Sequence, residues 1–182
     1  MTSILKVDTI QTAAGGTPTA ADLGLNVSGS VLQVISSTKT DIAIFSSDTF
    51  IDLNNLSVTI TPSSASSKIL ITASIKGAGT NNACRLQGRL VRDSTPIFVG
   101  ASSGSRTPAS FELYENENAG VSDASINFLD SPSTTSAVTY KIQGRDGNGS
   151  ASSVFVNRSQ DDLDAANYPR FASTITVMEI AG

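Results

Sequence analysis

Acidic side chains form the one dense group of residues in this chain that could do chemistry. Asp161, Asp162 and Asp164 lie close together in the segment RSQDDLD. Hydrolysis of a glycoside requires two carboxyl groups about 5–10 Å apart, on opposite sides of the bond that breaks. Because neighbours in one loop lie on the same side of any substrate, we expect a solvated loop here. Cation binding is the second interpretation, and catalysis is a remote third.

Nucleophilic and metal-dependent catalysis also lack the residues that they need. The chain has no His and one Cys, so a Ser–His–Asp triad cannot form, and we expect Cys84 to be a buried, small apolar residue. Asp146, Asn148 and Ser150 have the spacing of a calcium-binding loop. Asn157 stands where such a loop has its closing Glu, and the DGNG run is typical of a hairpin turn instead. We therefore predict a protein that is not an enzyme and holds no cofactor and no metal.

Two loops combine an aromatic ring with hydrogen-bonding side chains, as do sugar sites that do not cleave their ligand. One loop is FELYENEN, and the other continues from the acidic segment. Packing at a rim or at a subunit contact is the other interpretation of both loops, and the absence of Trp weakens the sugar-binding one. The residues considered for contact with a receptor or glycan are Tyr114, Asn116, Asn118, Tyr168 and Arg170.

These loops must be held by strands, because short alternating apolar and polar runs fill the chain from Val31 to Ile180. Such alternation is typical of half-buried strands. Short strands with turns throughout predict an all-β fold, a jelly-roll-like antiparallel β-sandwich. The predicted strands are Val31–Ser36, Asp48–Asn54, Leu56–Thr61, Lys68–Ile75, Cys84–Arg92, Thr95–Val99, Ala109–Tyr114, Asp123–Leu129, Ala137–Arg145, Ser152–Asn157 and Thr174–Ile180.

Turn residues predict how several of these strands are joined. Asn54-Asn55 is expected to join two paired strands, and Asp93-Ser94 to form a tight hairpin turn. Gly77–Asn82 (GAGTNN) is a strong turn signal. Asp146–Gly149 (DGNG) tolerates the positive φ of a hairpin turn, so Ser152–Asn157 is expected to pair back on the strand before it.

The first 30 residues differ from the rest, so we divide the chain into an arm and linker over 1–30 and a sandwich over 31–182. A short apolar patch precedes a Gly-rich loop, and the segment is too short to fold alone. We favour an arm that packs on a partner, and its alternative is a part of the sandwich core. Segments of this kind often become ordered only on their partner. The residues of the patch are Ile4, Leu5, Val7 and Ile10.

The charge distribution argues against two classes of partner. The net charge is −4, the pI is about 4.7, and 15% of the residues are charged. Lys and Arg are scattered, whereas non-specific nucleic-acid binding needs a concentrated basic surface. No apolar stretch approaches the roughly 18 residues of a membrane helix, and MTSILKVDTI lacks the pattern of a signal peptide. We expect synthesis in the cytoplasm, with neither nucleic acid nor membrane as a partner.

Both ends of the chain resemble one family of proteins. Leu5–Leu25 (LKVDTIQTAAGGTPTAADLGL) is similar to the N-terminus of virion fibre and decoration proteins of tailed bacteriophages, especially those of marine bacteria. Phe128–Arg145 (FLDSPSTTSAVTYKIQGR) and Ser173–Ala181 (STITVMEIA) resemble the C-terminal domain of phage tail-fibre proteins. In that family an LDSP-type turn precedes a TYKIQ strand, and a MEI-like strand ends the protein. Further segments that fit are Val31–Val34, Val58–Ser67 (VTITPSSASS) and Leu90–Ser94 (LVRDS).

The resemblance implies a jelly-roll-like fold, a homotrimer and a place on the phage particle, without a catalytic site. Because the shaft of a long fibre is missing, we interpret the chain as a structural virion component: a short fibre, a fibre tip or a surface decoration. Its expected partners are further copies of itself, other virion proteins bound through the arm, and a glycan of the host surface. The alternative is a non-enzymatic carbohydrate-binding module.

Overall fold

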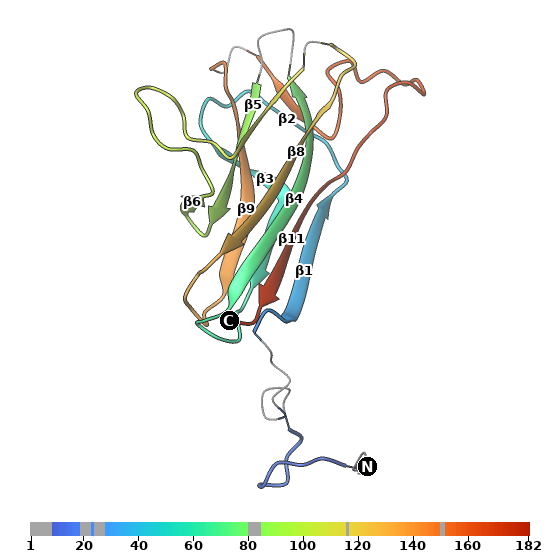
Figure 1. The fold of residues 1–182 in the computed structure, drawn as a ribbon. Coiled ribbons are helices and arrows are strands. Elements are labelled where there is room, and N and C mark those ends of the chain that lie inside the picture. Colours follow the sequence, from blue (N-terminus) through green and yellow to red (C-terminus); the bar gives the residue numbers. More distant parts are fainter. Residues whose placement is uncertain (1–8, 19–22, 24–27, 80–84, 116, 150–151) are drawn as a thin grey trace, which may run out of the picture.

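Two antiparallel sheets lie face to face in the computed structural model of the chain (Figure 1). The structure describes residues 9–18, 23, 28–79, 85–115, 117–149 and 152–182. Within this part of the chain there are strands and no helices. The strands are β1 (Val31–Lys39), β2 (Ala43–Phe45), β3 (Ile51–Ile60), β4 (Lys68–Gly79), β5 (Arg85–Arg92), β6 (Thr95–Ile97), β7 (Phe111–Tyr114), β8 (Ser122–Asp130), β9 (Val138–Asp146), β10 (Val154–Val156) and β11 (Ser173–Ile180).

The strand pairing is that of a jelly roll. In the first sheet, β8 pairs with one side of β4 along most of its length. On the other side of β4, its first part pairs with β11 and its last part with β10. The outermost strands are β1, which pairs with β11, and β2, which pairs with β10. In the second sheet the order is β3, β9 and β5, with β7 and β6 along the outer side of β5. Each sheet therefore has the width of four strands. The chain stays in one sheet from β1 to β2, from β5 to β7 and from β10 to β11, and it crosses to the other sheet at every other connection. This arrangement confirms the predicted fold class.

The core forms where the inward residues of the two sheets meet. In β4, Ile69, Ile71 and Ile75 are completely buried, while Leu70, Thr72 and Ser74 on the opposite face are half-buried. The predicted inward faces of Leu56–Ile60 and Val138–Ile142 are buried in the same way. The period of two in the sequence thus matches the pleat, and burial of branched side chains of this kind contributes roughly 1.5–3 kcal/mol each.

The prediction of two paired strands around Asn54-Asn55 is wrong. Residues Ile51–Ile60 are the single strand β3, and its register against β9 shifts between Asp52 and Ser57. Asn55 has a φ of 66°, which is used for a bulge within the strand and not for a reversal of the chain. Asn tolerates this left-handed conformation, so the same residue type suits both outcomes.

The predicted turn over Gly77–Asn82 is also wrong in its described part. Gly77–Gly79 are buried residues of β4 and pair with β10. A Cβ atom on Gly77 would lie 2.7 Å from Cδ2 of Leu86 and 2.9 Å from the carbonyl oxygen of Phe155. This glycine therefore permits close packing of strands. Asn82 and Cys84 lie outside the described residues.

The strand after the DGNG turn does not pair back on its predecessor. Gly149 has the positive φ expected of the turn (74°), but β9 belongs to the second sheet and β10 to the first. Because β3 and β5 already occupy both sides of β9, no free edge is left for β10 there. The chain instead crosses the sandwich, and β10 pairs with β4 and with β2, a strand that sequence analysis missed.

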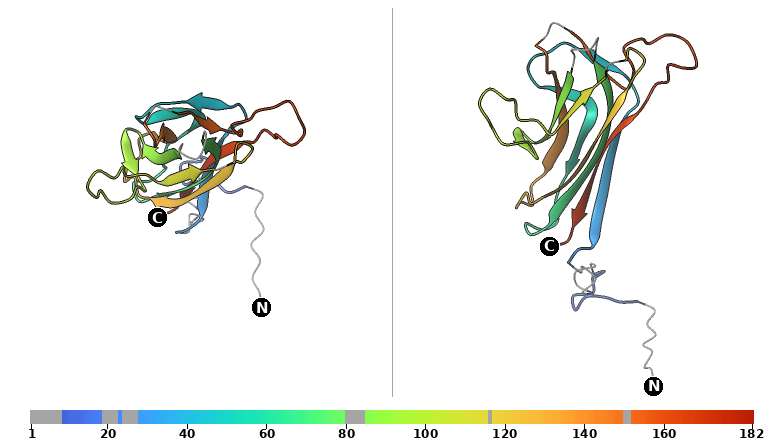
Figure 2. Two further views of the ribbon diagram at one scale, coloured as in Figure 1. Left: turned by 90° about the horizontal axis from the view of Figure 1, so that it is seen from above. Right: turned by 45° about the horizontal axis from the view of Figure 1, so that its top comes forward.

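The two ends of the sandwich differ. At one end the amide of Gly29 donates to the carbonyl oxygen of Ala181 (2.7 Å), and the amide of Ala181 donates to that of Ser30 (2.8 Å). Residues 29–30, which lead into β1, and the C-terminus therefore lie together there (Figure 1). The loops over 98–110 and 157–172 project near the opposite end (Figure 2). In the arm, Ile10 is exposed, and Ile4, Leu5 and Val7 lie outside the described residues.

Candidate functional site

The loop over 157–172 connects β10 to β11, two strands that lie one after the other along the same side of β4. Hydrogen bonds fix the base of this loop to the sandwich. Asn157 is fully buried with a φ of 63°. Its Nδ2 donates to the carbonyl oxygens of Lys39 (2.8 Å) and Asp41 (2.9 Å). Its Oδ1 accepts a bond of 2.6 Å from Ser173 Oγ, which itself accepts from the amide of Lys76 (2.9 Å). Asn157 thus closes the loop at the point where the sheet resumes.

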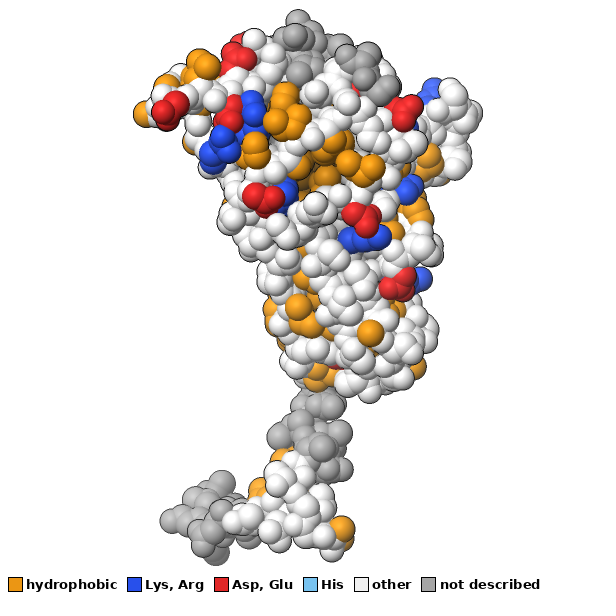
Figure 3. Space-filling view, turned by 180° about the vertical axis from the view of Figure 1, so that it is seen from behind, with side chains coloured by type: hydrophobic (Ala, Val, Ile, Leu, Met, Phe, Trp, Pro, Cys, Tyr) orange, Lys and Arg blue, Asp and Glu red, His pale blue; other side chains and the backbone are white. Residues whose placement is uncertain are grey.

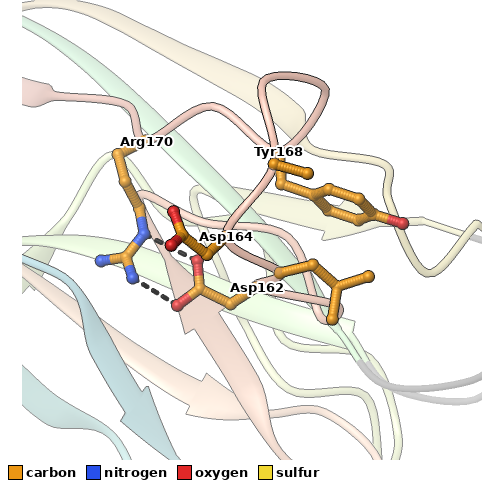
Figure 4. Close-up of a pocket in the computed structure, with 6 residues that line it drawn as sticks. Asp162, Asp164, Tyr168 and Arg170 are labelled. Carbon is orange, nitrogen blue, oxygen red and sulfur yellow. Dashed lines mark hydrogen bonds and ion pairs between the residues drawn. The ribbon is translucent and has the colours of Figure 1, made fainter.

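A hollow of about 380 Å³ lies in this loop (Figure 4). Arg170, Asp162 and Asp164 are on one side of it, and the Tyr168 ring extends on the other. Two of the five residues considered for glycan contact therefore line one hollow. The full lining consists of Asp162, Leu163, Asp164, Ala165, Tyr168 and Arg170.

Asp162 connects two parts of the loop through ion pairs with Arg158 and Arg170. Arg170 Nε donates to its Oδ1 at 2.7 Å, and Arg170 Nη2 donates to its Oδ2. Arg158 Nη1 lies 3.4 Å from the same Oδ2. The Asp162 side chain is 17% exposed, so it is not solvated as expected from the sequence, whereas Asp164 is exposed. A carboxylate paired bidentately with a guanidinium is held in one geometry.

The second predicted loop begins at the end of β7 and is arranged differently. The guanidinium of Arg85 lies 4.8 Å from the centre of the Tyr114 ring, so one ring face is already covered. Arg85 and Gln87 both donate to Glu112 (2.7 and 2.8 Å). Burial by itself raises the pKa of Glu112, but these two bonds and the charge of Arg85 outweigh it and lower that pKa. Asn118 is exposed, and Asn116 lies outside the described residues.

The two loops touch, although they do not share the hollow. The amide of Asp161 donates to the carbonyl oxygen of Asn118 at 3.0 Å. Tyr168 and Arg170 line the hollow, and Tyr114 does not. Sequence analysis found the aromatic and basic members of the site but missed the supporting residues Asn157 and Arg158. The one signal for Asn157 was a polar residue directly after the apolar run VFV.

Two further features are absent from the described residues, a metal-binding cluster and a membrane-spanning helix. No group of three or more His, Cys, Asp or Glu side chains is placed to hold a metal ion there. The same residues include no helix that is long and apolar enough to span a membrane.

Comparisons with known proteins show a distant structural similarity and no family. No protein-family model and no curated protein matches the chain. Among solved structures, the chain is similar to one described as the structure of infectious bursal disease virus, Gx strain, with 13% sequence identity and a TM-score of 0.40. The match covers 82% of this chain and 37% of that chain, so this chain spans little more than a third of that protein's length. The fold assignment rests on the strand pairing described above, and nothing about function follows from so distant a match.

Proposed function

We propose that this chain is a non-enzymatic structural component of a phage virion, a short fibre, fibre tip or surface decoration that assembles as a homotrimer. The observation that carries the proposal is the difference between the ends of the jelly roll. The arm leads into β1 at the end that holds the C-terminus, and the loop with the hollow projects near the other. A protein that is anchored at one end and makes contact at the other needs this arrangement.

The outer face of the first sheet offers a surface for contact between subunits. A row of apolar side chains crosses its whole width: Val34 pairs with Met178, Met178 with Leu70, and Leu70 with Leu129. Val34 and Leu129 are 56% and 47% exposed. Exposed apolar side chains gathered in this way are typical of protein interfaces.

The surroundings of this row are uncharged. The next row across the sheet consists of Ser36, Thr176, Thr72 and Asn127. On this face of β4, Lys residues stand only at the two ends, and one of them, Lys76, pairs with Asp123. Interface centres are depleted in charged residues, so two copies can meet here without opposing like charges.

The second sheet presents a different outer face. Arg85 pairs with Glu112 at 2.7 Å and Lys141 with Asp52 at 2.8 Å. In the view from behind, acidic and basic side chains lie against one another in pairs, without a broad area of one charge (Figure 3). Paired surface charges of this kind are typical of a solvated face. The contrast supports the first sheet as the side that other subunits cover.

The N-terminal arm is the proposed anchor to other virion proteins. Ile10 is 52% exposed, and it belongs with Ile4, Leu5 and Val7 to the apolar patch of the arm. A chain that lacks residues 1–25 is expected to fold but to be absent from assembled particles. Unfolding of the truncated chain would instead make the arm a part of the sandwich.

The experiment that tests the proposed assembly is sedimentation equilibrium of the full-length chain. We expect a mass near three times 18.8 kDa. A monomer would contradict the homotrimer and favour the alternative, a carbohydrate-binding module. That alternative is supported by the hollow beside Tyr168, which provides an aromatic ring and exposed polar groups.

A further inference from the structure

We propose that the hollow in the loop over 157–172 binds a neutral hexose unit of a glycan. This inference rests on the proposed function, because it identifies the place where the loop end of the protein contacts a host surface. Tyr168, Asp164 and Arg170 contact the hexose, while Asp162 and Arg158 maintain the conformation of the loop.

The loop has a fixed shape before any ligand binds. Asn157 and Ser173 connect its base to the sandwich. Within the loop, Asp162 is held by Arg170 and by Arg158, and the Arg158 guanidinium lies 4.9 Å from the centre of the Phe155 ring. A preorganised loop loses little conformational entropy when it binds, which favours recognition of a small ligand.

The lining matches the two kinds of surface on a pyranose ring. Tyr168 and the 59% exposed Leu163 provide apolar surface for the C–H face of a sugar. The exposed Asp164 carboxylate has no hydrogen-bond or ion-pair partner among the described residues. It is therefore free to accept hydrogen bonds from two adjacent hydroxyl groups. Arg170, which is 53% exposed, contributes Nη1 as a donor, since Nε and Nη2 are the atoms bound to Asp162.

The charge of the loop selects against acidic sugars. Asp161, Asp162 and Asp164 carry three negative charges, and Arg158 and Arg170 carry two positive ones. The charged residues that line the hollow, Asp162, Asp164 and Arg170, carry one net negative charge. A carboxylate on the ligand would be repelled by this net negative charge, whereas a neutral hexose would meet only hydrogen-bonding groups.

The inference is tested by saturation-transfer-difference NMR on the full-length protein, in whatever oligomeric state it adopts. The probes are the methyl glycosides of glucose, galactose and mannose, with methyl glucuronide as the acidic counterpart. We expect at least one neutral glycoside to bind with a Kd on the order of 1 mM, a typical strength for a single small contact site. Methyl glucuronide is expected to bind at least about tenfold more weakly.

Variants connect the binding to the hollow. Tyr168→Ala and Asp164→Asn are each expected to weaken binding by about tenfold, or roughly 1.4 kcal/mol. Tyr168→Phe keeps the ring without the hydroxyl and is expected to bind more strongly than Tyr168→Ala, which separates the contribution of the ring from that of the hydroxyl. Asp161→Asn is the matched control, since this residue belongs to the same loop but does not line the hollow. Amide NMR spectra of each variant verify that it is folded.

Each outcome decides one proposal. Failure of all three neutral glycosides to bind below about 50 mM, equal binding by Asp164→Asn, or a preference for the glucuronide overturns the sugar site. A trimer that binds no hexose overturns this inference and leaves the proposed virion role standing. A monomer that binds a hexose through Asp164 overturns the trimer and supports the carbohydrate-binding module.

Discussion

The hydroxyl of Tyr140 donates a hydrogen bond of 2.7 Å to Oδ2 of Asp130 in the interior of the sandwich. Arg92 donates to both oxygens of the same carboxylate, at 3.0 and 2.8 Å. Asp130 ends β8 in the first sheet, whereas Arg92 and Tyr140 belong to β5 and β9 in the second. Burial, together with the bond to Asp130, raises the pKa of Tyr140 well above its ordinary value. This cluster joins the two sheets through polar groups at the edge of the apolar core.

The same cluster unites sequence motifs that are far apart in the chain. Asp130 comes from LDSP, Tyr140 from TYKIQ and Arg92 from LVRDS. A second cluster also joins two distant motifs. Glu179 of the MEI segment accepts hydrogen bonds from the amide and the hydroxyl of Ser63 in VTITPSSASS, at 2.7 and 2.6 Å. These five segments, which carry the C-terminal part of the family resemblance, therefore supply contacts that hold the sandwich together. None of them lines the hollow.

Tyr140→Phe is expected to lower the free energy of unfolding by about 1–3 kcal/mol, because Asp130 loses a buried donor. Chemical unfolding monitored by circular dichroism measures the change. Tyr168→Phe is the matched control, since it removes a hydroxyl from the loop, and it should leave stability within about 0.5 kcal/mol of the wild type. Equal stability of the two variants would show that the bond between Tyr140 and Asp130 is not needed to hold the sheets together.

Glu179 is expected to make the protein sensitive to acid. Burial by itself raises its pKa, but hydrogen bonds from Ser63 and Gln33 outweigh this effect and lower the pKa to about 2, from an ordinary value of 4.5. A carboxylate whose pKa is lower in the folded state stabilises the fold fully above its unfolded pKa. That contribution is lost as the pH falls from about 4.5 towards 2. The melting temperature, measured across this range, should fall.

The variant Glu179→Gln distinguishes the contribution of Glu179 to acid sensitivity from that of the other carboxylates. We expect the variant to be less stable at pH 7 by about 1–3 kcal/mol, because an amide offers one acceptor oxygen in place of two. Its melting temperature should decline less between pH 4.5 and 2 than that of the wild type, since Glu179 no longer titrates. Parallel declines of the two proteins would assign the acid sensitivity to surface carboxylates such as Asp52, whose pKa is lowered chiefly by Lys141.

Sequence analysis predicted the parts of the fold that depend on neighbouring residues. The alternation in β4 correctly placed Ile69, Ile71 and Ile75 in the core. It did not predict which sheet β10 joins, because that depends on which strand edges are free. Asn55 was mistaken for a turn, since a positive φ serves a bulge equally well. Tyr168 and Arg170, which were selected by residue type, both line the hollow, whereas the ion pair of Asp162 with Arg170 depends on contacts within the folded loop.

Leu129→Lys is expected to disrupt the proposed trimer. Leu129 ends the apolar row on the outer face of the first sheet, and a charge buried at a subunit contact without a partner is costly. Sedimentation equilibrium at about 10 µM, within the range in which weakened interfaces dissociate, should show a mass shifted towards 18.8 kDa. Ser57→Lys, on an exposed position of β3 in the second sheet, is the control and should leave the mass unchanged. An unaltered mass for Leu129→Lys would exclude this row as the interface.

Gly77→Ala is expected to destabilise the protein, although Ala is the better strand residue. A Cβ atom at this position would lie 2.7 Å from Cδ2 of Leu86 and 2.9 Å from the carbonyl oxygen of Phe155. Of these two, the carbonyl belongs to β10, which pairs with β4 at this point and cannot shift without breaking the pairing. Overpacking of this kind costs about 1–3 kcal/mol, and chemical unfolding measures it.

Gly100→Ala is the control for this substitution, because the nearest atom to a Cβ there is the carbonyl oxygen of Ala109 at 3.9 Å. The control should be neutral, or slightly stabilising through the reduced freedom of the unfolded chain. If Gly77→Ala were as stable as Gly100→Ala, the contact between β4 and β10 would be looser than the structure shows. The base of the loop that carries the hollow would then be less rigid, since β10 leads directly into it at Asn157.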